Sequence, residues 1–224
     1  MAKKYKYNNQ YFSNTSVQNS YWGGFIAADG NISKNRLTIC VKRDDRIILE
    51  NFKSHIDFIG KIHDIEQIIY SNQHKFKKNQ YPQSRIRFTS KDFCKDLNNH
   101  FNITPKKSLT LKPPNLTDKN EILSYIIGYS DGDGCITTFT TKRQPNSYHT
   151  HLYIISTKEV LEWINNVLSN TGTITSISTN TYKLRYSGKK CRDIIKLLKD
   201  FAIENNLPIL SRKWDKINLL NFPQ

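Results

Sequence analysis

The chain has 224 residues and a net charge of +15, with 34 lysine and arginine residues against 19 acidic ones. A chain of this length buries a substantial core in one large domain or two small ones. The basic excess occurs in both halves and no apolar run is long enough to span a membrane. A nucleic acid is therefore the expected partner, and an anionic membrane surface is the weaker alternative.

The first twelve residues are basic, polar and rich in tyrosine, and they lack the apolar stretch of a signal peptide. Such a segment is typical of an arm that contacts DNA, and a disordered amino terminus explains it equally well. We expect the four widely spaced cysteines to be reduced and buried in an intracellular protein: Cys40, Cys94, Cys135 and Cys191. The composition leaves an organelle, a phage-infected cell and a bacterial cytoplasm equally open.

Two predicted helices end in similar nine-residue runs, WGGFIAADG at 22–30 and IIGYSDGDG at 126–134. Each carries small residues four positions apart, which share one helix face and let two backbones approach closely: Gly24 and Ala28, then Gly128 and Gly132. If the helices pack through these faces, Asp29 and Asp133 reach the same end of the pair and form a site for a divalent cation.

The helix ends offer further oxygen ligands. The carbonyls of Ala28 and Gly132 lack partners within their helices and carry partial negative charge, so they would add to the cation site. An apolar helix that ends in Asp-Gly is also an ordinary helix terminus. Two copies in one chain, each followed by a strand-like run, favour the cation site.

This pattern resembles the LAGLIDADG family of homing endonucleases in its single-chain, two-motif form, over roughly residues 17 to 220. The resemblance implies an α+β fold of two pseudo-symmetric αββαββα repeats, whose antiparallel DNA-binding sheets form a saddle. It also implies Mg²⁺ or Mn²⁺ bound by Asp29 and Asp133, which occupy the eighth motif position over the minor groove. The sixth position, usually acidic in the family, is Ala27 in the first copy and Asp131 in the second.

The residues after each motif repeat the same order of hairpin, helix, hairpin and helix. In the first half we expect a turn at 33–35, a strand at 37–41, and a helix at 45–59 that buries Leu49, Phe52, Ile56 and Ile59. In the second half we expect strands at 135–142 and 148–155 around a turn at 144–147, then a helix at 157–168. Two prolines at 113–114 divide the chain into repeats 1–112 and 113–224.

Alternation along the later strands places arginine and lysine on one face and apolar residues on the other. A solvated edge explains one such strand equally well, but repetition in a basic chain favours a ligand. Strands of this kind suit the major groove of DNA. The predicted contacts are Lys34, Arg36, Lys42, Arg85, Arg87, Lys142, Arg143, Lys183 and Arg185. His149 and His151 also alternate on a strand, without a third metal ligand, and are interpreted as a groove-facing or surface pair.

A lysine stands at a similar distance from each aspartate. Lys107 follows Asp29 by 78 residues, and Lys213 follows Asp133 by 80. Phosphodiester hydrolysis needs positive charge beside the developing phosphorane, which such lysines would supply. An ordinary surface lysine explains the spacing equally well, and the basic residue that the family carries beside its metal centre shifts the balance toward catalysis. Each lysine has a basic neighbour, Lys106 or Arg212, so a shift of one position stays open.

The sequence thus favours a monomeric, site-specific endonuclease that cuts both strands of duplex DNA at a long asymmetric target. The alternatives are a maturase that binds a group I intron RNA and a noncatalytic DNA-binding relative. The retained aspartates and lysines argue against the second alternative. The polar residue that the family carries in the strand after the first motif is replaced by Val41, with Ser156 at the comparable place, so equal cutting of the two strands stays open.

Overall fold

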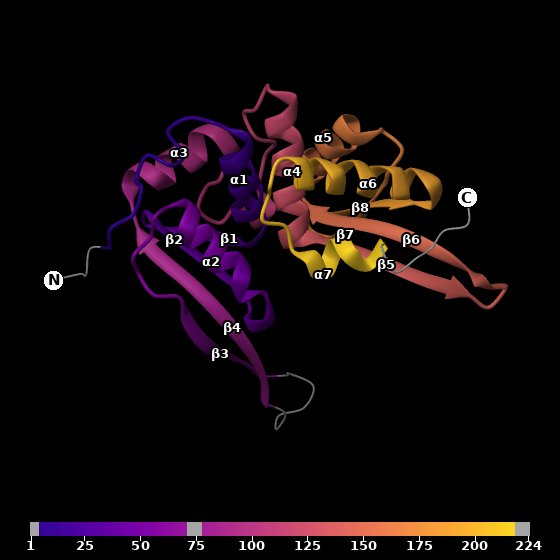
Figure 1. Ribbon diagram of the computed structural model, residues 1–224, viewed down its shortest axis with the longest axis horizontal. Coiled ribbons are helices and arrows are strands. Elements are labelled where there is room, and N and C mark those ends of the chain that lie inside the picture. Colours follow the sequence, from indigo (N-terminus) through magenta and orange to yellow (C-terminus); the bar gives the residue numbers. More distant parts are fainter. Residues whose placement is uncertain (1–4, 71–77, 218–224) are drawn as a thin grey trace.

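The computed structural model describes residues 5–70 and 78–217, and these form two halves of one α+β design (Figure 1). The first half runs α1 (Val17–Asp29), β1 (Gly30–Ser33), β2 (Arg36–Lys42), α2 (Arg46–His55), β3 (His63–Tyr70), β4 (Lys78–Thr89) and α3 (Lys91–Phe101). The second half runs α4 (Lys119–Asp133), β5 (Gly134–Thr141), β6 (Gln144–Ser156), α5 (Lys158–Leu168), β7 (Thr173–Ser178), β8 (Thr181–Ser187) and α6 (Gly188–Glu204). The predicted αββαββα order is confirmed in both halves.

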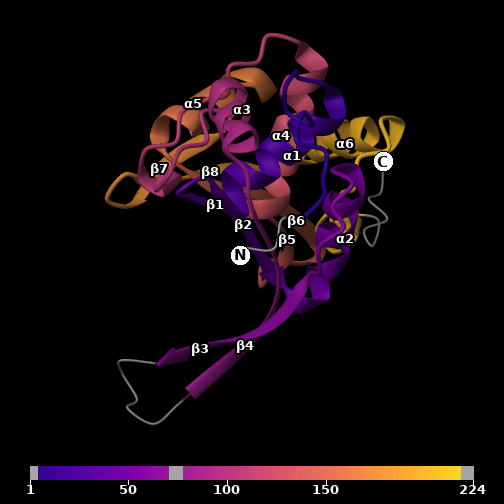
Figure 2. The same cartoon turned by 90° about the vertical axis from the view of Figure 1, so that its left-hand side faces the viewer.

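Each half has one antiparallel sheet of four strands, with the matching orders β1-β2-β4-β3 and β5-β6-β8-β7. The two sheets run away from the central helices in different directions and form the expected saddle (Figure 1). Figure 2 shows the β3–β4 hairpin projecting beyond the rest of the first half. Within the described residues, no helix has both the length and the apolar character of a membrane span.

Helices α1 and α4 pack against each other through their glycines. A Cβ atom at Gly24 would lie 2.0 Å from the carbonyl oxygen of Tyr125, and one at Gly128 would lie 1.9 Å from that of Tyr21. Any larger residue would force the two backbones apart. The small-residue faces predicted from the sequence are therefore what joins the two halves.

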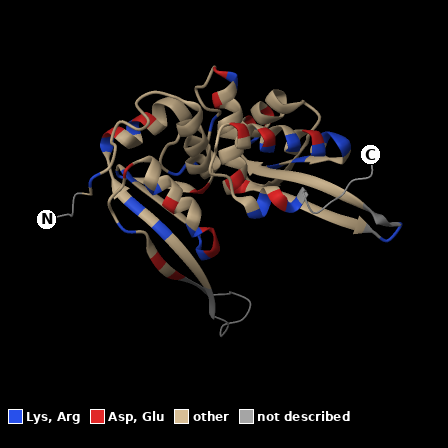
Figure 3. Ribbon diagram, viewed as in Figure 1, with Lys and Arg blue, Asp and Glu red and all other residues tan. Residues whose placement is uncertain are grey.

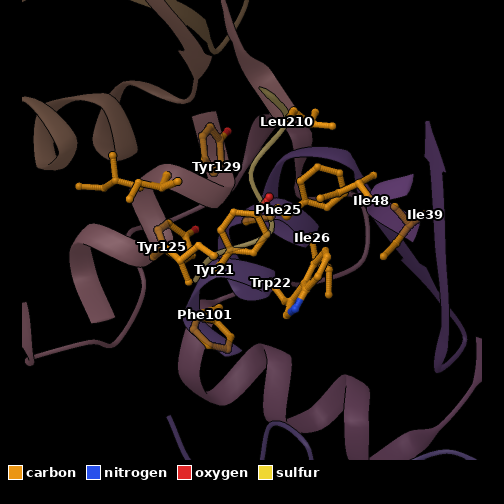
Figure 4. Packing of buried hydrophobic residues seen from close by; sticks show 14 of the residues in the cluster. Tyr21, Trp22, Phe25, Ile26, Ile39, Ile48, Phe101, Tyr125, Tyr129 and Leu210 are labelled. Atoms are coloured by element: carbon orange, nitrogen blue, oxygen red, sulfur yellow. The ribbon is translucent and has the colours of Figure 1, made fainter. Parts of the chain in front are cut away.

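The core extends outward from this helix pair. Figure 4 shows Tyr21 and Phe25 of α1 beside Tyr125 of α4, with Phe101 of α3 packed below them. All four side chains are at most 2% exposed. Both helices are buried almost all round, as expected for helices in the centre of a two-layer fold.

Four local expectations were wrong. Helix α2 ends at His55, because Asp57 has a left-handed backbone (φ 51°), and Ile59 is 70% exposed beyond that end. The β5–β6 turn lies at 142–143, so residues 144–147 belong to β6. Cys135 is exposed and Cys40 half-buried, although all four cysteines are free.

The fourth concerns the amino-terminal arm: residues 5–12 pack on the first half and are not a disordered start, whereas DNA contact by the arm stays a prediction and residues 1–4 lie outside the described residues. The Asn8 amide donates to the Ile56 carbonyl at 2.7 Å, and the rings of Tyr7 and Phe88 lie 4.8 Å apart.

Candidate active site

The central helices bring Asp29 and Asp133 to one end of the pair. Each aspartate is the last residue of its helix and precedes a glycine whose extended backbone starts the next strand. A Cβ at Gly132 would lie 2.3 Å from the Cβ of Ala28 and 3.4 Å from the Cγ of Asp29. The small residues at the helix ends therefore allow the two carboxylates to approach each other closely.

The two carboxyl groups have raised pKa values. Both residues are exposed as a whole, but their carboxyl groups are largely surrounded by protein atoms. This desolvation raises the pKa of Asp29 to about 6, with the negative charge of Asp133 as the second cause. Desolvation also raises the pKa of Asp133, and Lys107 and Lys213 oppose the rise at both aspartates. Added positive charge at this point therefore favours the ionised carboxylates.

Lys107 stands beside the end of α1. It begins the short helix η2 (Lys107–Leu109) and is 6% exposed. Its Nζ donates a hydrogen bond to the carbonyl oxygen of Ala28 at 2.9 Å. Burial lowers the pKa of the ammonium group, and the charges of Asp133 and Asp29 counter that fall.

Lys213 holds the equivalent place at the end of α4. It lies in helix α7 (Ser211–Trp214) and is 9% exposed. Its Nζ donates to carbonyl oxygens around the helix end, at 3.2 Å, 3.1 Å and 2.9 Å from those of Ser130, Gly132 and Gly134, and it also contacts the carbonyl of Asp131. Burial lowers the pKa of Lys213, and the charges of Asp131, Asp29 and Asp133 counter that fall.

The basic neighbours of the two lysines have other positions. Lys106 is exposed and has a left-handed backbone (φ 61°). Arg212 donates from its Nε and Nη2 to the two carboxylate oxygens of Asp45, a residue of the first half that is 5% exposed. Of the two possible registers, only Lys107 and Lys213 place an ammonium group on the motif helix ends.

Sequence reasoning missed the role of Asp131, the sixth motif residue. Its carboxylate accepts hydrogen bonds from the Tyr21 hydroxyl at 2.7 Å, the Trp214 Nε1 at 2.7 Å and the Leu210 amide at 3.2 Å. Desolvation raises its pKa to about 6, and these hydrogen bonds counter part of the rise. Asp131 thus ties α4 to α1 and to the segment that carries Lys213. The only signal in the sequence was an acidic residue in one motif copy and Ala27 in the other.

The remaining sequence candidates are the two helix-end carbonyls and the two residues at the expected polar position. The Ala28 and Gly132 carbonyls each accept a lysine ammonium, which leaves one lone pair on each oxygen. Val41 is buried on β2. The Ser156 hydroxyl accepts a hydrogen bond from the Tyr129 hydroxyl at 2.8 Å. The expected polar side chain is therefore missing at Val41, whereas the second half has a serine whose hydroxyl is already bonded to Tyr129.

The donor set fits a divalent cation that shares its ligands with a substrate. Among the described residues, no cluster of three or more His, Cys, Asp or Glu side chains offers a complete protein cage. Mg²⁺ is commonly held by one or two carboxylates together with water and substrate phosphate oxygens. Asp29 and Asp133 supply two such carboxylates, and the mutual repulsion that raises the pKa of Asp29 is relieved by a cation.

The predicted DNA-contacting residues divide between hairpin turns and open sheet faces. Lys34 lies in the β1–β2 turn, and Lys142 and Arg143 lie in the β5–β6 turn. In β2 and β4, residues that alternate with the buried Leu37, Ile39, Ile86 and Phe88 face away from the core, and they include Arg36, Lys42, Arg85 and Arg87. Lys183 and Arg185 alternate with the buried Leu184 and Tyr186 on β8 in the same way. The face assignment made from alternation is therefore confirmed.

No protein-family model matches the sequence, and no curated protein matches it. Several solved structures share its fold. The I-LtrWI LAGLIDADG homing endonuclease bound to target DNA is 13% identical, with a TM-score of 0.55 over 95% of this chain and 90% of that one. Meganuclease I-SmaMI bound to uncleaveable DNA is 14% identical, with a TM-score of 0.58 over 92% and 90%. LAGLIDADG meganuclease I-AabMI bound to uncleaved DNA is 15% identical, with a TM-score of 0.52 over 90% and 87%. The chain thus has the LAGLIDADG homing endonuclease fold.

Proposed function

We propose that this chain is a site-specific DNA endonuclease that hydrolyses both strands of a long, asymmetric duplex target with a divalent metal. One observation carries the proposal: Asp29 and Asp133 converge with two buried lysines at the point where both sheets begin. The DNA-bound structures of I-LtrWI and I-SmaMI, which share the fold, support duplex DNA as the partner. The structure of I-SmaMI with uncleaved DNA and calcium ions supports a divalent cation.

In this proposal the aspartates bind the cation and the lysines stabilise negative charge on the attacked phosphate. A bound Mg²⁺ or Mn²⁺ supplies Lewis acidity and a nucleophilic water at neutral pH. Asp29 and Asp133 hold that cation at the junction of the two halves. Lys107 and Lys213 place positive charge where negative charge develops on the attacked phosphate. Because helix carbonyls already fix both ammonium groups, little reorganisation is needed during the reaction.

The test is cleavage of a randomised duplex library in the presence of Mg²⁺, followed by sequencing of the cut ends. We expect one long sequence to be enriched and cut on both strands, and EDTA to stop the reaction. Asp29→Asn removes one metal-site charge and should stop cutting, whereas Asp44→Asn, an exposed carboxylate outside the centre, should not. If the library yields no cut duplex, the assignment is wrong. Enriched binding without cutting supports the noncatalytic alternative instead.

The same proposal covers oligomeric state and cellular location. Both motif helices come from one chain, so the proposed centre is complete in a monomer. Light scattering of the DNA complex should give one protein copy per duplex.

The free cysteines agree with an intracellular location. A filter-binding assay with group I intron RNA tests the maturase role.

A further inference from the structure

The two open sheet faces differ in chemistry. On the first sheet, Lys42 of β2 stands opposite Gln83, Cys40 opposite Arg85, and Thr38 opposite Arg87. The open face of β2 and β4 therefore consists of cations and hydrogen-bonding groups. Figure 3 shows lysine and arginine spaced along these strands, whereas the long strands β5 and β6 of the second sheet carry none and the blue residues lie in the turn between them.

The second sheet carries a row of rings on the corresponding face. Phe139 stands opposite His149, and Cys135 opposite Tyr153. The Phe139 ring lies 5.5 Å from that of His149 and 4.9 Å from that of His151, and His151 lies 5.5 Å from Tyr153. The Lys183 Nζ lies 5.4 Å over the Tyr153 ring, so one of the two cations on β8 is held against the aromatic row.

This aromatic row is not part of the core. Phe139 is 40% exposed and Ile155, on the same face, is 39% exposed. The core side of these strands is filled by Ile136, Leu152 and Ile154. The row starts next to the candidate active site, because β5 begins directly after Asp133. It is bordered by cations in the β5–β6 turn and on β8, which suits an occupant that is itself polyanionic.

The apolar feature that DNA presents in its major groove is the C5-methyl group of thymine, whereas arginine and lysine pair best with guanine. We propose that the second sheet reads thymine methyl groups and that the first sheet reads guanine, so the two half-sites differ in composition. Phe139 is six residues beyond Asp133. At about 3.3 Å per residue, its contact lies roughly four to six base pairs from the cleavage centre. This inference rests on the proposed function.

The test uses base analogues in the target that the library selects. Deoxyuridine lacks only the methyl group of thymine, and 7-deazaguanine lacks the N7 acceptor. Each is placed in one half-site at a time, and the dissociation constant is measured by fluorescence anisotropy with Ca²⁺ in place of Mg²⁺. We expect deoxyuridine to weaken binding about fivefold in one half-site only. We expect 7-deazaguanine to weaken binding about tenfold in the other half-site and clearly less in the half-site where deoxyuridine acts, because the second open face adds only Arg185 and the ring-bound Lys183 on β8.

Variants assign each half-site to a sheet. Phe139→Ala should abolish the deoxyuridine effect, and Arg87→Ala should abolish the 7-deazaguanine effect. Tyr148→Ala is the matched control, since Tyr148 is exposed on the same strand but adjacent to His149, and its side chain takes the opposite face. Far-UV circular dichroism checks that each variant is folded.

Three results contradict the inference: equal analogue effects in both half-sites, no effect in either, or a deoxyuridine effect that survives in Phe139→Ala. A library that enriches no duplex defeats the proposed function itself. The two failures are therefore distinguishable.

Discussion

The two motif helices end alike at the candidate active site but are fastened differently behind it. In both halves an aspartate ends the helix and a buried lysine donates to the last turn. In the second half Asp131 accepts three hydrogen bonds, and one of them comes from the residue next to Lys213. In the first half the same motif position is Ala27, which offers no acceptor. Tyr125 of α4 is the counterpart of Tyr21, since each directly precedes its motif run, and its buried hydroxyl has no partner among the described residues. The two halves are therefore alike in the aspartates and lysines of the candidate active site, and they differ in the hydrogen bonds that hold the helix ends from behind.

This difference makes the two lysines unequal in their dependence on the fold. Lys213 sits among four carbonyl oxygens in a segment that Asp131 and the Arg212–Asp45 ion pair both hold. Lys107 lies in a three-residue helix and makes one side-chain hydrogen bond to the residues that the structure describes. We expect substitutions at the shared groups to act similarly in both halves, and substitutions of the supporting groups to act in the second half alone.

The largest expected effect is at the shared aspartates. Asp29→Asn and Asp133→Asn each remove one charge from the cation site, so double-strand cleavage should fall by at least about a thousandfold. DNA affinity measured by gel shift should change little, because neither change touches the sheets. Asp44→Asn is the control. If one variant cuts both strands at the parental rate, the two ends are not equivalent.

The lysines come next. Lys107→Met and Lys213→Met keep most of the apolar stem but remove the charge, and single-turnover cleavage should fall by about 10²- to 10³-fold. Lys213→Met should also lower the free energy of unfolding by about 2 kcal/mol more than Lys107→Met, because it leaves more buried carbonyls without a donor. Urea denaturation measures that difference. Lys106→Met, at an exposed position, should match the parent in both assays.

Asp131 tests the support directly. Asp131→Ala leaves the Tyr21 hydroxyl, the Trp214 indole and the Leu210 amide without their acceptor, which should cost about 3 kcal/mol of unfolding free energy. Asp131→Asn is milder and should slow cleavage about tenfold without changing DNA affinity, because it shifts the segment that carries Lys213. Asp200→Ala removes an exposed carboxylate from α6 and serves as the control. Parental kinetics and stability in both Asp131 variants would show that the network is dispensable.

The sequence predicted what depends on local periodicity. Glycine spacing gave the face that joins α1 to α4, and alternation gave the open faces of β4 and β8. Sequence-based prediction of an element's end failed where the backbone conformation of a single residue determines it. The left-handed backbone at Asp57 ended α2 early and left Ile59 exposed.

Long-range partners were beyond the reach of the sequence. The spacing located the basic residue of each half to within one position, at 106–107 and 212–213. The structure was needed to choose between the neighbours, because Arg212 pairs with Asp45 of the other half. The partners of Asp131 come from positions 21, 210 and 214, which no local pattern connects. The helix pair and the sheet faces were predicted correctly because each depends on a short local pattern of residues.

The smallest effect gives the cleanest comparison, because it uses the same substitution at equivalent positions. Tyr21→Phe removes a hydroxyl that donates to Asp131 and lies 3.0 Å from the Pro208 carbonyl, so unfolding free energy should fall by about 1 kcal/mol. Tyr125→Phe removes a buried hydroxyl that lacks a partner among the described residues, so it should be neutral or stabilise the protein by up to about 1 kcal/mol. Both rings are fully buried and both substitutions keep the ring, so core packing is unchanged in each case. Urea denaturation of the two variants side by side measures the difference. If the Tyr125 variant is destabilised as much as the Tyr21 variant, the first half has a hydroxyl acceptor of its own, and the asymmetry between Ala27 and Asp131 does not explain how the two halves are held.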